Sequence, residues 1–319
     1  WLSNNSIDAV IGMDYSKVSE GIKLNGEPGL LWMDNARKYG RMNGVIDNKD
    51  KDAVIVNPCM TYDTKLLTNK GYIVLGENVG KIVNVWNGEK WTPAEIKMTG
   101  HNREVFKCTF NDGSYNICTP NHKFILKNGT EKEIQDLMYD DVLQNSNCIR
   151  CDDEGIELDD AYDRGFFCGD GTYKVPSDYD KNFVPLYGFS LNTRLNYLAG
   201  IFDSNGNLSF ENNIGYIRLH SVNYDYLYNV KLLINSLGIY CNFNKQYDEK
   251  NKALYEINIT NDQIIKLIEL GLNTHRLQIN KLTKSSKNYE IKIQLKSVEH
   301  YGYADVYCVT TLDDSHKAV

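Results

Sequence analysis

The stretch Gly-Ser-Tyr-Asn-Ile-Cys-Thr-Pro-Asn-His occupies residues 113–122. It starts at the turn signal Asn111-Asp112-Gly113, continues as a β-like run and ends on Thr119 and His122. Asn and Asp before Gly favour hairpin turns because these residues tolerate a positive φ. The stretch therefore predicts a strand that follows a hairpin and ends in a small group of polar side chains.

The neighbouring residues continue this β texture. Short β-like runs at 72–75, 81–86 and 105–110 are separated by turn signals such as Asn87-Gly88. Runs of this length with punctuation between them are typical of an all-β module. Residues 64–143 therefore predict a module of roughly a hundred residues, an ordinary domain size.

A different texture follows in residues 206–272. Strand-like runs at 207–210, 216–221, 240–246 and 254–260 alternate with amphipathic helical patterns at 226–237 and 262–270. Gly238 and Gly271 stand where these helices should end, and Asn261 stands where the second should be capped. The order ββαββα predicts an α+β unit. Near the N-terminus, residues 30–42 predict a further helix.

Composition limits the class of protein. The chain has 319 residues, a net charge of −7 and 42% hydrophobic residues, which fits two or three folded modules and excludes wholesale disorder. No apolar run reaches eighteen residues, so we expect no membrane span. The first residues form no signal peptide and lack a starting Met, so we expect the chain to begin inside a longer protein.

The cysteines indicate a reducing, cytoplasmic setting. Eight cysteines in a chain of this length are too sparse for a disulfide scaffold. Cys148 and Cys151 form a Cys-x-x-Cys pair, but a zinc site would need a second pair at similar spacing. We interpret them as reduced thiols.

Charge is distributed unevenly along the chain. Residues 151–205 carry eleven acidic and four basic side chains, whereas residues 206–300 carry nine acidic and twelve basic ones. Such a basic segment could neutralise phosphates. From charge alone, a solvated surface arm is an equally good interpretation. The candidate DNA-binding residues are Arg276, Lys281, Lys284, Lys287, Lys292 and Lys296.

Candidate nucleophile chemistry lies in the β module. Cys59 follows Asn57-Pro58, and Thr119-Pro120-Asn121-His122 comes sixty residues later. Cys308 and His316 lie near the C-terminus. A cysteine with a histidine nearby in space can act as an activated nucleophile, although six His and eight Cys also allow accidental pairs.

In combination these blocks resemble an intein, the self-splicing element with a Hint fold. Cys59 with Asp63-Thr64 and Gly71 matches the first block, residues 113–122 match the Thr-x-x-His block, and residues 306–319 match the block before the C-terminal splice junction. The resemblance implies that Cys59 converts the Pro58 peptide bond to a thioester, without a cofactor. It also implies that His122 donates to the scissile nitrogen and Thr119 supports that geometry.

The end of the chain departs from this family pattern. Cys308 stands where the family usually has Asp, at a position that couples the splicing steps, and His316 would aid the final cleavage. The family finishes with His-Asn and a nucleophile in the next segment, whereas this sequence stops at Val319. We therefore expect it to make at most the N-terminal thioester and to cleave there.

Residues 163–171 and 198–206 resemble the two LAGLIDADG motifs of homing endonucleases. The resemblance implies two helices packed side by side through the small residues Gly165, Ala199 and Gly200. It also implies an acid at each helix end that binds Mg²⁺ for DNA cleavage. The ββαββα unit would then grip DNA.

Two features predict that this endonuclease is degenerate. Asp170 is present, but Asn205 stands at the partner position, and a neutral amide binds Mg²⁺ poorly. The gap from residue 172 to 196 is too short for a complete first repeat. The alternatives are an active endonuclease and a DNA-binding module without cleavage.

Residues 1–58 resemble a catalytic-barrel segment of ribonucleotide reductase, most like the adenosylcobalamin-dependent class rather than the iron-dependent one. The resemblance rests on Asn25-Gly26-Glu27-Pro28-Gly29, on Asp34-Asn35-Ala36-Arg37 and on Asn57-Pro58-Cys59. An unrelated loop-helix-loop is the alternative. The implied partners are DNA, the remainder of the host reductase and its nucleotide substrate, diphosphate or triphosphate.

The predicted fold is an all-β Hint horseshoe interrupted by an α+β LAGLIDADG-type insertion and preceded by an α/β-barrel fragment of the host enzyme. The predicted domains are 1–58 (reductase fragment, the N-extein), 59–150 (N-terminal part of the splicing domain), 151–290 (endonuclease-like, first repeat shortened) and 291–319 (C-terminal part of the splicing domain, truncated).

Overall fold

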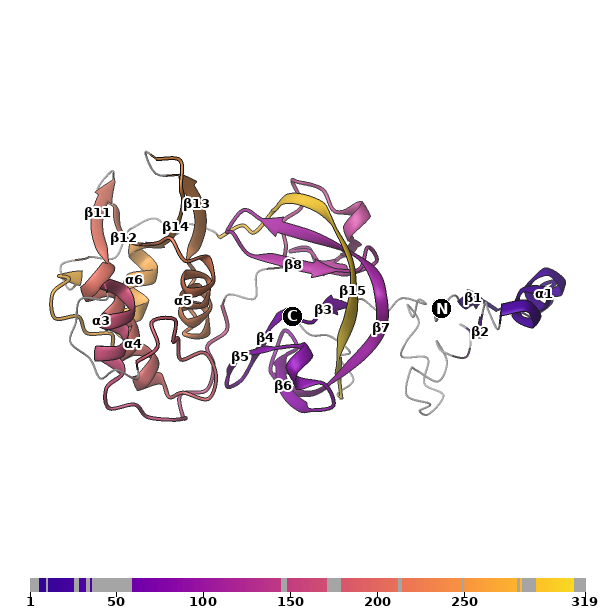
Figure 1. Cartoon of the computed structure of the whole chain (residues 1–319), viewed down its shortest axis with the longest axis horizontal. Helices are drawn as coiled ribbons and strands as arrows, with labels where there is room; N and C mark the ends of the chain where they lie inside the picture. The colour runs from indigo at the N-terminus through magenta and orange to yellow at the C-terminus, as the bar shows by residue number, and fades with distance from the viewer. Residues whose placement is uncertain are drawn as a thin grey trace.

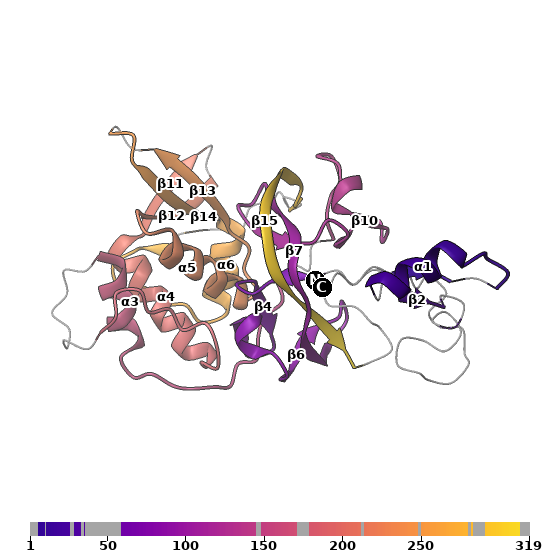
Figure 2. The same cartoon turned by 45° about the vertical axis from the view of Figure 1, so that its right-hand side comes forward.

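The computed structural model describes residues 6–9, 11–25, 29–32, 35, 59–144, 148–170, 179–211, 214–247, 250–279, 282 and 291–312. Within these ranges the chain forms an N-terminal segment, a β unit (residues 59–144 and 291–312) and an insertion (residues 148–282). Figures 1 and 2 place the insertion and the N-terminal segment at opposite ends, with the β unit between them. None of the helices in the described ranges has the length and hydropathy needed to span a membrane.

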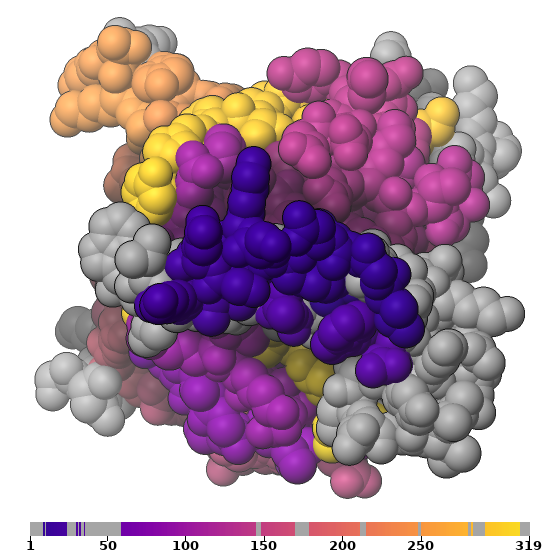
Figure 3. Space-filling view, turned by 90° about the vertical axis from the view of Figure 1, so that its right-hand side faces the viewer, coloured from indigo at the N-terminus to yellow at the C-terminus, as the bar shows by residue number. Residues whose placement is uncertain are grey.

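The N-terminal segment contains two short strands and a helix. Strands β1 (Ser6–Asp8) and β2 (Gly29–Leu31) pair in parallel, and α1 (Ser16–Asn25) connects them. Figure 3 shows these elements in indigo in front of the β unit. The predicted helix over 30–42 is wrong at its start, because Leu30 and Leu31 pair with Ile7 and Asp8. Most of its other residues lie outside the described ranges.

The β unit is a seven-stranded sheet with the strand order β15-β3-β8-β7-β6-β4-β5. Its longest strands, β7 and β15, pair antiparallel, and Figure 1 shows that they curve together. A short hairpin of β9 and β10 lies beside the sheet. The strands are β3 (Met60–Thr61), β4 (Lys65–Thr68), β5 (Gly71–Val74), β6 (Ile82–Trp86), β7 (Trp91–Phe110), β8 (Tyr115–Cys118), β9 (Lys123–Ile125), β10 (Glu131–Glu133) and β15 (Leu295–Thr311).

The insertion combines two paired helices with a sheet and two further helices. Helices α3 (Ala161–Asp170) and α4 (Leu191–Asn205) pack together, and the four-stranded sheet has the order β11-β12-β14-β13. The ββαββα order is observed as predicted. Its elements are β11 (Asn207–Glu211), β12 (Ile214–Ser221), α5 (Tyr224–Ser236), β13 (Asn242–Tyr247), β14 (Ala253–Thr260) and α6 (Asn261–Glu269).

Local signals explain where these helices start and stop. Ser190 caps α4 by accepting a hydrogen bond from the Thr193 amide, and Asn223 caps α5 in the same way. Gly238 and Gly271 adopt φ of +78° and +107° after α5 and α6, a conformation that glycine adopts without a Cβ penalty. The predicted Asn261 cap is wrong by one residue, because Thr260 holds the N-cap position and makes no side-chain cap.

The largest core lies in the insertion and reaches into the β unit. Buried residues of α4, α5 and the four-stranded sheet form it, and Tyr72 and Tyr115 of the β unit pack against it. The backbone is joined there as well, since the Asp152 amide donates to the Asn69 carbonyl. The β unit has three smaller clusters of its own. The predicted boundary at residue 150 therefore falls inside a packed interface.

Candidate functional site

Cys59 immediately precedes β3, which pairs with β8 on one side and β15 on the other. Its carbonyl oxygen accepts a hydrogen bond from the Thr119 amide at 3.0 Å. Its own amide donates to Thr119 Oγ1 at 3.3 Å. Two residues sixty positions apart are thus connected through both backbone and side chain.

The Cys59 thiol is buried, with 4% of the residue exposed. Its Sγ lies 3.0 Å from the Thr99 hydroxyl on β7. Burial raises the pKa of this thiol to about 11, and the Thr99 hydrogen bond opposes that rise. Sequence analysis did not single out Thr99, since nothing in its neighbourhood along the chain marks it as a partner of Cys59.

His122 follows Thr119 through a tight turn in which the His122 amide donates to the Thr119 carbonyl at 2.9 Å. Its ring contacts Phe124 edge to face at 5.0 Å. The ring Nδ1 is buried and makes no hydrogen bond within the described part of the chain. Burial lowers the pKa of His122 to about 4, so the imidazole is neutral at pH 7 and donates through a single N–H.

Cys308 lies on β15 and packs against the small cluster that contains Cys59, Val105 and Val306. Its charge, when ionised, adds to the rise in the pKa of Cys59, after the larger effects of burial and Thr99. The other two residues predicted for splicing, Pro58 and His316, lie outside the described residues. The structure therefore brings Cys59, Thr119 and Cys308 into one region and leaves the scissile bond itself undescribed.

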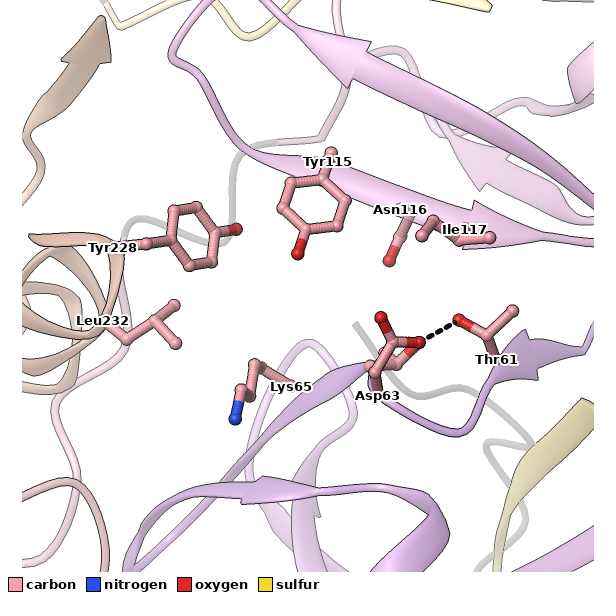
Figure 4. Close-up of a pocket in the computed structure, with 9 residues that line it drawn as sticks. Thr61, Asp63, Lys65, Tyr115, Asn116, Ile117, Tyr228 and Leu232 are labelled. Carbon is pink, nitrogen blue, oxygen red and sulfur yellow. Dashed lines mark hydrogen bonds between the residues drawn. The ribbon is translucent and has the colours of Figure 1, made fainter. Parts of the chain in front are cut away.

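A small cavity of about 60 Å³ lies where the β unit meets the insertion. Figure 4 shows Tyr115 and Asn116 from β8 on one side, Tyr228 and Leu232 from α5 on another, and Asp63 hydrogen-bonded to Thr61 below. The cavity has room for only a few water molecules. It is therefore part of the interface rather than a site for a nucleotide or a metal.

The two helices of the LAGLIDADG-like motifs make a very close backbone contact. A Cβ added to Gly165 would lie 1.9 Å from the Tyr197 carbonyl oxygen, and one added to Gly200 would lie 2.1 Å from that of Tyr162. Only glycine permits this spacing. Ala199, the third small residue, is buried in the core of the insertion. Gly169 also lies at the helix contact, facing Ser204.

The end of this helix pair does not fit a two-acid Mg²⁺ site. Asp170 ends α3, and the placement of its side chain lies outside what the structure describes. Asn205 ends α4, where its amide donates to the Gly169 carbonyl at 3.2 Å and accepts from the His220 amide at 3.0 Å. Both ends of the Asn205 amide are thus occupied by the fold. No group of three metal-binding side chains occurs among the described residues.

The carboxylate of Asp203 is engaged in hydrogen bonds that hold the fold together. Its carboxylate accepts hydrogen bonds from the backbone amides of residues 275–277 and from the Tyr162 hydroxyl. Burial alone would raise the pKa of Asp203, but these donors outweigh it and lower the pKa below the usual value. This residue therefore anchors the segment after α6 to α4.

The described members of the predicted basic set lie in different parts of the chain's structure. Arg276 lies beside α4 and donates to the Ser204 carbonyl. Lys296 lies on β15 of the β unit, and Lys292 precedes that strand. Lys281, Lys284 and Lys287 lie outside the described residues. The described members of the set are therefore divided between two units.

The sheet of the insertion presents a polar face that sequence analysis missed. Ile217, Leu219, Ile257 and Ile259 are fully buried, so the alternate positions of β12 and β14 project from the opposite face. Strand alternation is the signal that could have found this face. The register and alternation assign to it Asn207, Ser209, Tyr216, Arg218, His220, Asn242, Asn244, Gln246, Glu256 and Asn258.

Comparisons with known proteins relate parts of the chain to two kinds of protein. Residues 192–270 match the family described as LAGLIDADG-like domain. A probable adenosylcobalamin-dependent ribonucleoside-triphosphate reductase from Dictyostelium discoideum is 54% identical over 61 residues, which cover 19% of this chain and 8% of that protein. The corresponding enzyme from Euglena gracilis is 48% identical over 60 residues, covering 19% of this chain and 8% of that protein.

A longer alignment joins the chain to a viral protein. The ribonucleoside-diphosphate reductase large subunit of Invertebrate iridescent virus 6 is 22% identical over an alignment of 374 residues, covering 93% of this chain and 38% of that protein. The chain thus spans well under half the length of each of these reductases.

Two crystal structures of a variant Ssp DnaB mini-intein are similar. One has a TM-score of 0.26 and 14% identity, covering 28% of this chain and 62% of that one. The other has a TM-score of 0.33 and 8% identity, covering 82% of this chain and 99% of that one.

The LAGLIDADG and reductase parts of the resemblance drawn from the sequence are supported by these similar proteins. Residues 192–270 are similar to a LAGLIDADG-like domain, and a stretch of about sixty residues is similar to adenosylcobalamin-dependent ribonucleoside-triphosphate reductases.

Proposed function

We propose that this chain is part of a ribonucleotide reductase precursor interrupted by a self-splicing element, and that Cys59 forms its N-terminal thioester. The observation that carries the proposal is the double contact between Cys59 and Thr119 at 3.0 and 3.3 Å. The double contact holds the carbonyl oxygen and the amide nitrogen of Cys59. This nitrogen is the one that must separate from the Pro58 carbonyl carbon. A strand of ordinary structural purpose would not need a threonine side chain at that nitrogen.

The first step is an acyl shift from nitrogen to sulfur. Sγ of Cys59 bonds to the Pro58 carbonyl carbon, the bond from that carbon to the Cys59 nitrogen breaks, the thiol loses its proton and the departing amine gains one. Nδ1 of His122 has no hydrogen-bond partner among the described residues, and a neutral imidazole has one ring nitrogen that can take up a proton and one that can release a proton to the departing amine. The contact from the Cys59 amide to Thr119 holds the scissile nitrogen in a fixed position.

The remaining roles rest on the family resemblance. Cys308 would couple the two splicing steps, supported by its packing against the Cys59 cluster, and His316 would aid the final cleavage. Residues 1–58 would be the host fragment, supported by reductase relatives that match over about the same length. The host would then use adenosylcobalamin and reduce a nucleotide after splicing.

The test is thiol-induced cleavage of the full chain, followed by mass spectrometry of the released N-terminal fragment. Dithiothreitol should release residues 1–58 from the unchanged chain and from Cys168→Ala, a cysteine of α3 outside the site. Cys59→Ala should release nothing. Thr119→Val should slow release by about tenfold, the cost of one neutral hydrogen bond, and Thr119→Ser should restore most of the rate. Cleavage after residue 58 in Cys59→Ala would refute the proposal.

We propose further that the LAGLIDADG-like domain binds DNA but has lost cleavage. The polar sheet face, rich in Asn and Gln, supports DNA binding, because these amides form bidentate contacts with base edges. The amide of Asn205, engaged at both ends, supports the loss of cleavage. A duplex carrying the uninterrupted host sequence should be bound in a salt-sensitive manner and stay intact with Mg²⁺. Cutting of that duplex would contradict this proposal.

A further inference from the structure

The pairing of β7 with β15 contains an irregularity beside Cys59. Val306 lies opposite Gly100 and Tyr307 lies opposite Met98, so Thr99 is an extra residue without a partner position on β15. A bulge of this kind re-aims the side chain of the inserted residue. Here the inserted residue is a threonine, and its hydroxyl lies 3.0 Å from Cys59 Sγ.

The same hydroxyl also connects Cys59 to the strand that carries Cys308. Thr99 Oγ1 donates to the Val306 carbonyl oxygen at 3.3 Å. Val306 in turn lies opposite Thr61 on β3, two residues after Cys59. The Thr99 side chain therefore contacts Cys59, the nucleophile at the N-terminal splice junction. It also contacts β15, the strand that leads towards the C-terminal splice junction.

The chemistry of a hydroxyl fits both protonation states of a thiol. A threonine hydroxyl has one donor and two acceptor lone pairs. While it donates to Val306 it can accept from the Cys59 S–H, which fixes the direction of the thiol. After the thiol loses its proton, rotation about the C–O bond lets the hydroxyl donate to the thiolate instead. A buried thiolate needs such a donor, because burial disfavours its charge.

We propose that Thr99 is the positioning residue of the Cys59 thiol: it orients the S–H in the resting state and donates to the thiolate as the sulfur attacks. The inference deepens the proposed function, since it concerns the residue that would form the thioester. The alternative is that Thr99 only fills the bulge, with a hydroxyl that happens to lie beside a sulfur atom.

The direct test measures Cys59 itself and does not depend on splicing. The full chain is alkylated with iodoacetamide over a range of pH, and the labelling rate of Cys59 is followed by peptide mass spectrometry. Thr99→Val should move the midpoint of the Cys59 profile to higher pH by roughly half a unit to one unit, as expected for a lost hydrogen bond to a charged group. Thr99→Ser should keep the midpoint of the unchanged chain.

The second readout is thiol-induced cleavage after residue 58. Thr99→Val should slow it by roughly fivefold to thirtyfold, whereas Thr99→Ser should stay within about threefold. Thr92→Val, which replaces a buried threonine elsewhere on β7, is the matched control and should change neither readout. If Thr99→Val is poorly folded by circular dichroism, Thr99→Ala replaces it against the same serine substitution.

The outcomes separate the two proposals. A shifted alkylation midpoint with rescue by Thr99→Ser supports the role of Thr99 even if no cleavage occurs, in which case the splicing proposal fails by itself. An unchanged midpoint in Thr99→Val overturns the inference. Equal impairment by the serine and valine substitutions also overturns it, because the shape of the bulge and not the hydroxyl would then matter.

Discussion

Lys231 Nζ lies 3.0 Å from Asp112 Oδ2, and both side chains are almost completely buried, at 3% and 4% exposed. Lys231 belongs to α5 of the insertion, whereas Asp112 belongs to the turn between β7 and β8 of the β unit. That turn is also held through its backbone, because the Phe243 amide donates to the Asp112 carbonyl. Since β8 leads directly to Thr119, the insertion supports the strand that reaches the candidate site.

We expect Lys231→Met to lower the free energy of unfolding by about 3–5 kcal/mol, because it leaves the Asp112 carboxylate buried without its partner. The double variant with Asp112→Asn should recover part of that loss, which a double-mutant cycle in urea would measure. Lys132→Ala breaks the more exposed pair with Asp141 and should cost less than about 1 kcal/mol. Strictly additive effects of the two buried substitutions would contradict the coupling.

The buried His122 predicts a specific acid sensitivity. Its pKa in the folded chain is about 4, below the value of an exposed histidine, so the unfolded chain binds the proton more readily. The stability from the neutral ring is complete above about pH 6.5 and is lost as the pH falls towards 4. Urea unfolding of the unchanged chain should lose on the order of 1–3 kcal/mol more over this range than His122→Gln. His101→Gln, which alters an exposed histidine, should behave like the unchanged chain, and identical pH profiles for all three would contradict the prediction.

The helix contact between α3 and α4 predicts a graded cost for added methyl groups. Gly165→Ala places Cβ 1.9 Å from a backbone carbonyl oxygen, which cannot rotate away, so the helices must separate at a cost of about 1–3 kcal/mol. Gly169→Ala meets the Ser204 hydroxyl instead, and that side chain can change its rotamer. We therefore expect a smaller loss in Gly169→Ala by thermal or urea unfolding. A larger loss in Gly169→Ala would show that the helices are spaced differently.

Restoring an acid at position 205 should not restore a nuclease. Asn205→Asp removes the donor to the Gly169 carbonyl, so we expect a loss of about 1 kcal/mol in stability. Nicking of a supercoiled plasmid that carries the uninterrupted host sequence should stay absent with Mg²⁺. Asn196→Asp, at an exposed position of the same helix, is the control for the added charge. Mg²⁺-dependent nicking by Asn205→Asp alone would show that the rest of the site is intact.

Local patterns predicted the elements well wherever a segment carries its own signal. The helices α5 and α6 end two residues before Gly238 and Gly271, and β8 follows its turn, because capping and turn chemistry act over a few residues. Strand bounds were predicted less well where they depend on pairing with a strand that is distant in the sequence. Strand β7 extends back to Trp91 because β6, β15 and β8 pair with different parts of it, whereas its own residues around His101 and Asn102 are polar and exposed.

The sequence alone singled out the blocks around Cys59, Thr119 and Cys308 as candidates and predicted the two motif helices, because each is a short run whose residue types and order are visible along the chain. Only the tertiary structure placed Thr99 beside the Cys59 thiol, Lys231 against Asp112 and the Asn205 amide between Gly169 and His220. The physical reason is the same in each case. These contacts depend on strand register, a bulge and helix packing, which arise when distant segments compete for the same buried space and leave no periodicity in the sequence.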